Sequence, residues 1–235
     1  FPLKPTIYLP NGVDTRVFNP GDENGFRKTH SIDTNAKVIL CVSRIDPQKN
    51  QLALLTLLKE LRDKHSKTSP YHLVLVGPAT NESYLNDINQ FVCDHDLQNQ
   101  ISLITGLEPD SSELRDAYRA ADLFILPSVH EPFGIVVLEA WASGLPVIAS
   151  KLGGLSKLIK HESNGLHINP NKSESLLNAV LELNNKPALA KAMANNGLNE
   201  AKRSYSWENY VNLLMNFYDD VESWHHNHCL NGLQL

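Results

Sequence analysis

The sequence predicts an α/β fold in which a Rossmann-like, doubly wound parallel sheet is covered by helices on both faces. Short apolar runs, first at residues 37–42 and again at residues 73–76, alternate with longer segments of helical periodicity. Strands that alternate with helices in this way form parallel sheets with both faces buried. The last third differs, since residues 173–183, 189–203 and 207–224 have the pattern of successive helices.

The elements between these landmarks follow from local signals. Leucines recur at helical spacing through residues 50–64, which predicts a helix behind the first strand. Ser111 or Ser112 can cap a helix that runs through Tyr118, because a short hydroxyl accepts hydrogen bonds from the free amides of a first turn. The same reasoning predicts further helices at residues 84–93 and 133–143, and strands at 101–105, 122–126, 147–149 and shortly after residue 165.

Composition limits the function classes. Hydrophobic residues make up 42% and charged residues 20% of the chain, as in a globular protein. A net charge of −5 argues against general affinity for nucleic acid or an anionic membrane, so a phosphate-bearing ligand needs local cations and backbone amides. No apolar run approaches the length of a membrane span, and the start lacks a signal-peptide layout. The three cysteines fit no zinc spacing, so we expect reduced thiols and a cytoplasmic location.

The loop at residues 43–50 is the first candidate ligand site, because ligands of open α/β sheets bind beyond the carboxyl ends of the strands. It brings Arg44 and Lys49 to the end of the first strand. Arginine can hold a phosphate through two parallel donors, and lysine adds a mobile point charge. Taken alone, this segment is read equally well as a solvated polar loop.

The helix start at residues 129–134 is the second candidate. Gly134 allows a ligand to approach the backbone closely, and the free amides at the positive end of the helix suit a phosphate. Glu139, the only charge in that helix, lies roughly 7–8 Å further along the axis. That distance suits a ribose diol when a diphosphate occupies the helix end, since a carboxylate accepts two hydroxyl donors. By itself, Glu139 could equally mark a solvated stripe.

Two other signals are weaker. Gly153 and Gly154 permit tight approach of backbone to ligand, although paired glycines are also ordinary turn residues. Gly106 and Leu107 follow a strand end and could offer backbone groups and an apolar wall to a flat base. The chain has no G-x-G-x-x-G after its first strand, no P-loop and no G-x-S-x-G, which removes the main support for the dehydrogenase, P-loop and α/β-hydrolase classes.

The stretch from Glu131 to Glu139 resembles the Glu-x7-Glu motif of retaining GT-B glycosyltransferases, the group that includes sucrose-phosphate synthases and bacterial glycogen synthases. The likeness continues through the helix and strand behind it to Gly153 and Gly154. It extends to PNGVDTRVF at residues 10–18, VSRIDPQKN at residues 42–50 and YSWENY at residues 205–210. These motifs follow the family's order over nearly the whole chain.

The resemblance implies a role for each candidate residue. Arg44 and Lys49 would grip the donor diphosphate, and Glu131 would contact hydroxyls of the donor sugar, so these three are the expected catalytic residues. The expected donor-binding residues are Glu139 at the ribose, Phe133, Gly134 and Ile135 at the helix start, and Leu107 with Gly106 at the base. The family usually needs no metal or other cofactor, because cations neutralise the departing diphosphate.

The resemblance also has limits. Ser156 and Lys157 stand where the family often has Pro-Glu, so we assign that loop no fixed contact. The match covers only the C-terminal, donor-binding domain of a two-domain fold. We therefore expect a linker segment at residues 1–18, a nucleotide-sugar-binding domain with C-terminal helices at residues 19–224, and a tail at residues 225–235 for which disorder stays open. Without an acceptor domain, the chain alone is expected to be inactive.

These observations predict the donor half of a retaining hexosyltransferase. Its expected partners are a UDP-, GDP- or ADP-sugar and a carbohydrate or similar acceptor, with no nucleic acid and with membrane contact only through the parent protein. The loop at residues 43–50 is closest to sucrose-phosphate synthases, which favours UDP-glucose. Alternatives are a non-catalytic nucleotide-sugar-binding module, disfavoured because all four charged site residues are retained, and a sugar-nucleotide epimerase of similar fold, which would alter the sugar without an acceptor.

Overall fold

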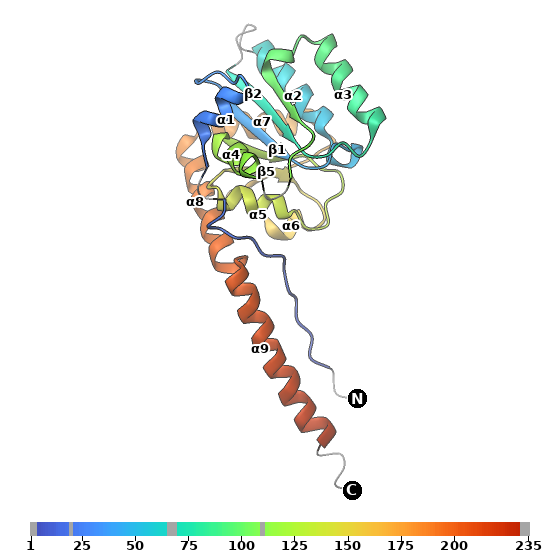
Figure 1. The fold of residues 1–235 in the computed structure, drawn as a ribbon, viewed down its shortest axis with the longest axis vertical. Coiled ribbons are helices and arrows are strands. Elements are labelled where there is room, and N and C mark those ends of the chain that lie inside the picture. Colours follow the sequence, from blue (N-terminus) through green and yellow to red (C-terminus); the bar gives the residue numbers. More distant parts are fainter. Residues whose placement is uncertain (1–3, 19–20, 65–69, 109–110, 231–235) are drawn as a thin grey trace.

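The computed structural model describes residues 4–18, 21–64, 70–108 and 111–230, and its centre is a six-stranded parallel sheet (Figure 1). The strand order is β3-β2-β1-β4-β5-β6, with parallel pairing between all neighbours. This order confirms the predicted doubly wound sheet. The strands are β1 Lys37–Val42, β2 Tyr71–Val76, β3 Ile101–Ile104, β4 Leu123–Leu126, β5 Val147–Ser150 and β6 Leu166–Ile168.

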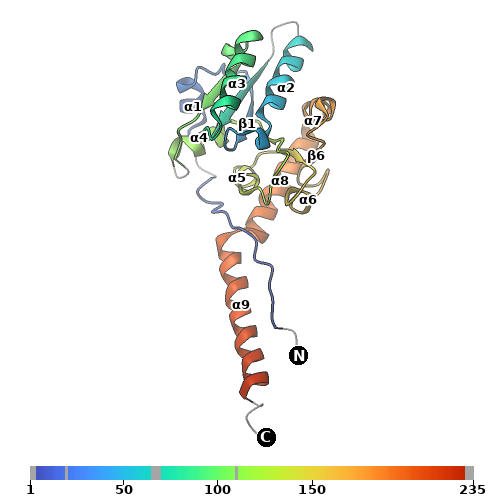
Figure 2. The same cartoon turned by 90° about the vertical axis from the view of Figure 1, so that its right-hand side faces the viewer.

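Helices cover both faces of the sheet, as Figures 1 and 2 show from two sides. One face carries α1 (Glu23–Thr29), α4 (Ser112–Ala120), α5 (Ile135–Ala142) and α6 (Leu155–Leu158). The other carries α2 (Gln51–Lys64), α3 (Glu82–Asp94) and α7 (Ser173–Asn185). The long helix α8 (Pro187–Ser204) contributes Met193 to one core cluster and Ala201 to the other.

Strand β1 illustrates why the strands are apolar throughout. Val38 and Leu40 point into the core under α4 and α5, whereas Ile39 and Cys41 point into the core under α2. Alternate side chains of a strand face opposite sides, so a strand covered on both faces needs apolar residues at every position. Burial raises the pKa of the Cys41 thiol to about 12, which fits its predicted place in the core.

Several element boundaries differ from the predicted ones: β2, for example, begins at Tyr71, two residues before its predicted start. Helix α5 begins at Ile135, two residues later than predicted, because Gly134 has a positive φ of 95° and acts as its N-cap. Helix α1 is missing from the sequence-based prediction. It is only 7 residues long, and Asp22 caps it by accepting a hydrogen bond from the Gly25 amide. A helix this short has weak periodicity and depends on tertiary packing.

The first described residues and helix α9 extend from the same side of the globular part (Figures 1 and 2). Helix α9 (Trp207–His225) projects from the globular part and buries none of its residues. Residues 226–230, for which the sequence leaves disorder open, instead continue α9 as a π-helical turn, His226–Leu230. The rings of Trp224 and His228 stack with their centroids 5.1 Å apart, as residues four apart on one helical face can. Residues 231–235 of the predicted tail lie outside the described residues.

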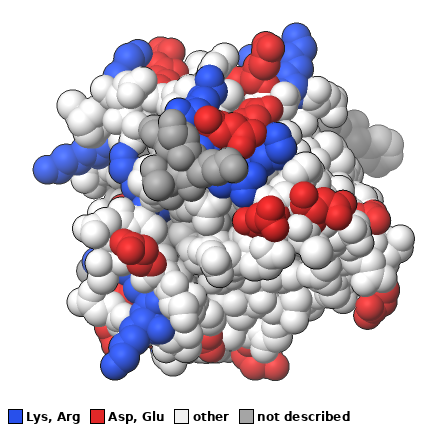
Figure 3. Space-filling model, turned by 90° about the horizontal axis from the view of Figure 1, so that it is seen from above, with Lys and Arg blue, Asp and Glu red and all other residues white. Residues whose placement is uncertain are grey.

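The face seen in Figure 3 carries charges of both signs. Lys and Arg side chains lie next to Asp and Glu side chains in its upper part, and a broad uncharged area lies between the remaining charges. None of the helices in the described part of the chain is both long and apolar enough to cross a bilayer.

Candidate functional site

The two loops singled out in the sequence meet at the centre of the sheet. Strands β1 and β4 are neighbours, yet the chain leaves them toward opposite edges of the sheet. Ligands of open α/β sheets bind at such a switch point, outside the carboxyl ends of the strands. The loops are joined there, because the Val129 amide donates to the Gln48 carbonyl at 2.8 Å and the Asn50 side chain donates to the Pro127 carbonyl at 3.2 Å.

Lys49 and Glu131 form an ion pair across these loops. The Lys49 Nζ lies 2.8 Å from Oε2 of Glu131, and each of the two side chains is only 12% exposed to solvent. Lys49 ends a single 3-10 turn, η1 (Pro47–Lys49), which Asp46 caps by accepting from the Gln48 amide. An ammonium has three donors and a carboxylate two oxygens, so both groups can bind a ligand while remaining paired.

Arg44 reaches the same end of the sheet but faces solvent. Its carbonyl accepts a 2.7 Å hydrogen bond from the Gln51 side chain, which holds its backbone in place. Within the described part of the chain, its guanidinium forms no hydrogen bond or ion pair. The Arg44 side chain is therefore an exposed cation in the same loop as Lys49, with all of its donors available to an anion.

The start of α5 offers backbone amides to the same region. Gly134 makes no side-chain cap, and the first turn closes with the Val137 amide bonded to the Gly134 carbonyl at 2.9 Å. The amides of the first turn thus lack a side-chain acceptor, and they carry the positive end of the helix dipole. Ile135 is exposed beside them. Phe133 is half-buried, and the centroids of the Phe133 and Tyr205 rings lie 6.3 Å apart with the two rings nearly perpendicular. An anion is the natural acceptor for this helix end.

Gly153 and Gly154 support this turn from behind. The Gly154 amide donates to the Glu131 carbonyl at 3.1 Å. A Cβ added at Gly154 would collide with the Pro132 carbonyl oxygen and lie 2.7 Å from Cα of Phe133, and one added at Gly153 would collide with the Glu131 carbonyl. The paired glycines are therefore required because two backbones lie in close contact. This structural role adds to the two interpretations based on the sequence, which were close approach of a ligand and an ordinary turn.

Glu139 is anchored by a residue that the sequence did not single out for function. The Tyr118 hydroxyl, on α4, donates to Oε2 of Glu139 at 2.6 Å. Burial raises the pKa of Glu139, and the hydrogen bond from Tyr118 partly opposes that rise by stabilising the ionised form. A buried phenol within reach of a helix carboxylate is a tertiary contact, so no spacing in the sequence signals it.

Gly106 and Leu107 stand apart from this group. They follow β3, which lies at the edge of the sheet two strands from β1. Leu107 packs half-buried against the core cluster beneath α4 and α5, and Gly106 is exposed with open space where a Cβ would stand. Among the described residues, no hydrogen bond joins them to Arg44, Lys49 or Glu131, so their predicted role at the base stays a prediction.

Comparison with known proteins decides the family. The sequence profile of the family described as glycosyl transferases group 1 matches residues 22–200. This protein belongs to that family. An uncharacterized glycosyltransferase of Methanocaldococcus jannaschii is 31% identical over 212 residues, which is 88% of this chain and 52% of the relative. The chain spans about half the length of the curated relatives it matches.

Solved structures agree with this assignment to the glycosyl transferases group 1. A sucrose-phosphate synthase from Thermosynechococcus elongatus superposes with a TM-score of 0.76 at 25% identity, over 92% of this chain and 52% of that chain. HepE of Anabaena in complex with UDP superposes with a TM-score of 0.77 at 25% identity, over 90% of this chain and 56% of that chain. The fold is therefore that of one domain of a GT-B glycosyltransferase.

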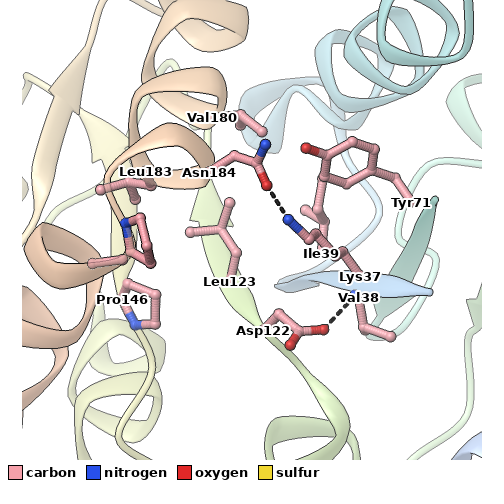
Figure 4. A pocket seen from close by; sticks show the side chains of 12 residues that line it. Lys37, Val38, Ile39, Tyr71, Asp122, Leu123, Pro146, Val180, Leu183 and Asn184 are labelled. Carbon is pink, nitrogen blue, oxygen red and sulfur yellow. Dashed lines mark hydrogen bonds between the residues drawn. The ribbon is translucent and has the colours of Figure 1, made fainter. Parts of the chain in front are cut away.

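This group 1 domain also has a pocket at the opposite end of the sheet (Figure 4). Its walls come from the amino ends of β1 and β4 and from α7, with Ile39, Leu123 and Leu183 among the apolar side chains. At its rim the Lys37 ammonium donates to the Asn184 side chain, and Asp122 accepts from the Val38 amide at 2.8 Å. Because it lies at the amino ends of the strands, it is separate from the Lys49–Glu131 site.

Replacing Glu139 with Gln is expected to stabilise the free domain at neutral pH. The pKa of Glu139 is raised in the folded state, so its ionisation costs stability above the folded pKa, and the cost disappears as pH falls below the ordinary value. Gln keeps an oxygen that can accept from Tyr118 but carries no charge. Thermal unfolding should show a higher Tm for Glu139→Gln than for wild type at pH 7.5, with the gap closing toward pH 4. An equal gap at both pH values would contradict this, and Glu222→Gln on the exposed face of α9 is the control.

Proposed function

We propose that this chain binds the nucleoside diphosphate part of a sugar donor, as the donor half of a retaining glycosyltransferase that transfers a hexose to a carbohydrate or similar acceptor. The observation that carries the proposal is the convergence of Lys49, Glu131 and the start of α5 at the carboxyl ends of β1 and β4, where no side chain caps the α5 amides. Two cations and a helix end suit a diphosphate, and carboxylates on either side suit sugar hydroxyls.

Each group has a part in this proposal. Arg44, Lys49 and the first-turn amides of α5 bind the diphosphate, and Glu131 turns its second oxygen toward the hydroxyls of the transferred sugar. Negative charge develops on the diphosphate as the bond to the sugar breaks. Fixed cations and amides stabilise that charge most strongly in the transition state, without a metal in the proposed mechanism.

The remaining contacts concern the nucleoside. Glu139 lies one turn into α5, where its free oxygen can accept from a ribose diol, and Leu107 supplies an apolar surface for the base. UDP is the first candidate because HepE, a structural neighbour, was solved with UDP, and because a sucrose-phosphate synthase is another neighbour. UDP-glucose follows as the preferred donor, with GDP-mannose and ADP-sugars as the alternatives to be distinguished.

Retention of the anomeric configuration is part of the proposal for the whole protein. Its support is the Glu-x7-Glu spacing of Glu131 and Glu139 on either side of the α5 start. The acceptor site is proposed to lie in a second domain facing these loops, so the chain by itself should bind donor but transfer little or no sugar. NMR of the product formed by the two-domain protein would show the anomeric configuration directly.

A nucleotide screen tests the proposed function on the chain as it stands. Isothermal calorimetry with UDP, GDP and ADP should show binding of at least one at micromolar to millimolar concentration, and binding should not require added Mg²⁺ or Mn²⁺. The diphosphate should bind more tightly than the corresponding nucleoside. A folded sample that binds none of the three at millimolar concentration would overturn the proposal.

A further inference from the structure

Tyr118 has a fully buried polar side chain to which the proposed function assigns no role. Its side chain is 0% exposed, and its hydroxyl donates to Oε2 of Glu139 at 2.6 Å, with the Val136 carbonyl further away at 3.4 Å. Buried tyrosines generally satisfy their hydroxyl with a partner, and a short O–H···O⁻ bond is among the stronger ones. Here the partner is the only carboxylate on α5.

The Tyr118 ring is held from two directions. Phe18, just before α1, meets it edge-on with centroids 5.4 Å apart, and Phe124 of β4 stacks on it at 5.9 Å. Phe18 is itself tied to α5, because its carbonyl accepts from the Ser143 hydroxyl at 3.2 Å. Two separate segments therefore hold the Tyr118 ring, and through it they fix the position of the Glu139 carboxylate.

This arrangement determines how Glu139 can accept hydrogen bonds. Two carboxylate oxygens offer about four acceptor positions, and Tyr118 occupies one of those on Oε2. A ribose diol presents two adjacent hydroxyl donors and needs two acceptors at a fixed separation. A carboxylate that turns freely, or that takes up a proton in its half-buried site, cannot offer them reliably.

We propose that Tyr118 is a positioning residue for nucleotide recognition, which orients Glu139 so that its remaining acceptor positions meet the two hydroxyls of a ribose. This inference rests on the proposed function and deepens it, because it makes the domain selective for ribonucleotides through a side chain that never touches the ligand. Tyr118 acts only through Glu139.

The test compares one diphosphate with its 2′,3′-dideoxy analogue, using whichever of UDP, GDP and ADP binds wild type most tightly. Calorimetry should show that wild type prefers the ribonucleotide. Tyr118→Phe keeps the ring and removes the hydroxyl, so it should weaken ribonucleotide binding by about tenfold and leave dideoxy binding nearly unchanged. The ribose preference should collapse in Glu139→Gln as well, and adding Tyr118→Phe to that variant should change it no further.

Tyr84→Phe is the matched control. Tyr84 is also buried, and its hydroxyl accepts from the Leu52 amide at 3.0 Å on the other face of the sheet, far from α5. This variant should lose stability and keep the ribose preference. Should Tyr118→Phe fail to fold, Phe18→Leu removes one of the rings that hold the phenol and should lower the preference at least about twofold.

The outcomes separate this inference from the proposed function. If wild type binds none of the three nucleotides, the proposed function itself has failed. If wild type binds and prefers ribose, but Tyr118→Phe weakens both ligands equally and leaves the ratio intact, the phenol is merely structural and the inference is overturned. Binding by wild type without any preference for ribose would also overturn it.

Discussion

Replacing Lys49 with Met should lower the affinity of the chain for a nucleoside diphosphate by about a hundredfold. Two effects act in the same direction. The variant loses a charge-assisted donor to the diphosphate, and it leaves Glu131 as an unpaired, mostly buried carboxylate that repels the incoming anion. Affinity for the nucleoside without phosphates should change much less. Calorimetry with diphosphate and nucleoside measures both values.

A double variant separates these effects. Adding Glu131→Gln removes the stranded charge, so Lys49→Met/Glu131→Gln should recover about tenfold of the lost diphosphate affinity. The matched control is Lys59→Met, which breaks an ion pair of similar length, 2.9 Å to Asp63, on α2. It should leave nucleotide binding unchanged. Equal losses of diphosphate and nucleoside affinity in Lys49→Met would show that Lys49 does not contact the phosphates.

Replacing Gly154 with Ala should have the second-largest effect. The new Cβ would collide with the Pro132 carbonyl and press on Cα of Phe133, and backbone atoms cannot swing aside as a side-chain end can. The turn before α5 must shift, which we expect to cost about 1–3 kcal/mol of folding free energy. The shift also moves the first-turn amides of α5 and the Glu131 carboxylate, so diphosphate affinity should fall by about tenfold or more.

Gly197→Ala provides the control for this prediction. Its Cβ would collide with the buried ring of Trp141 where α8 crosses α5, away from the turn. That variant should be destabilised to a similar degree, yet each folded molecule should bind diphosphate as wild type does. Comparing Tm and dissociation constant for the two variants distinguishes displacement of the site from a general loss of stability. A Gly154→Ala protein with wild-type affinity would contradict the support assigned to the glycine pair.

Much of the fold could be predicted from the sequence because periodicity and turn residues carry it. Strand β1 has the predicted bounds, since a strand buried on both faces is an unbroken apolar run between polar loops. Of the two serines predicted as possible caps, Ser111 forms the cap, accepting from the Leu114 amide. Helix α1 and the late start of α5 at Ile135 could not be predicted, because one is too short for a periodic signal and the other depends on the backbone of Gly134.

Part of the candidate site could likewise be predicted from the sequence, and part of it could not. Parallel-sheet topology brings the loops after β1 and β4 together, so the approach of Lys49 to Glu131 follows from the fold class. The contact from Tyr118 to Glu139 does not, since it depends on how α4 packs beside α5. Nor does the contact of Gly153 and Gly154 with the turn at residues 131–133, which requires knowing that two loops touch through their backbones.

The most direct test of the central claim is to map where a nucleoside diphosphate binds. Backbone amide shifts of the labelled chain, recorded by NMR during titration with the tightest binder among UDP, GDP and ADP, would locate the site. We predict the largest changes at residues 133–137 and around Lys49, with smaller changes near Glu139. Changes confined to the opposite end of the sheet, around Lys37 and Asn184, would show that the nucleotide does not bind at the carboxyl ends of β1 and β4.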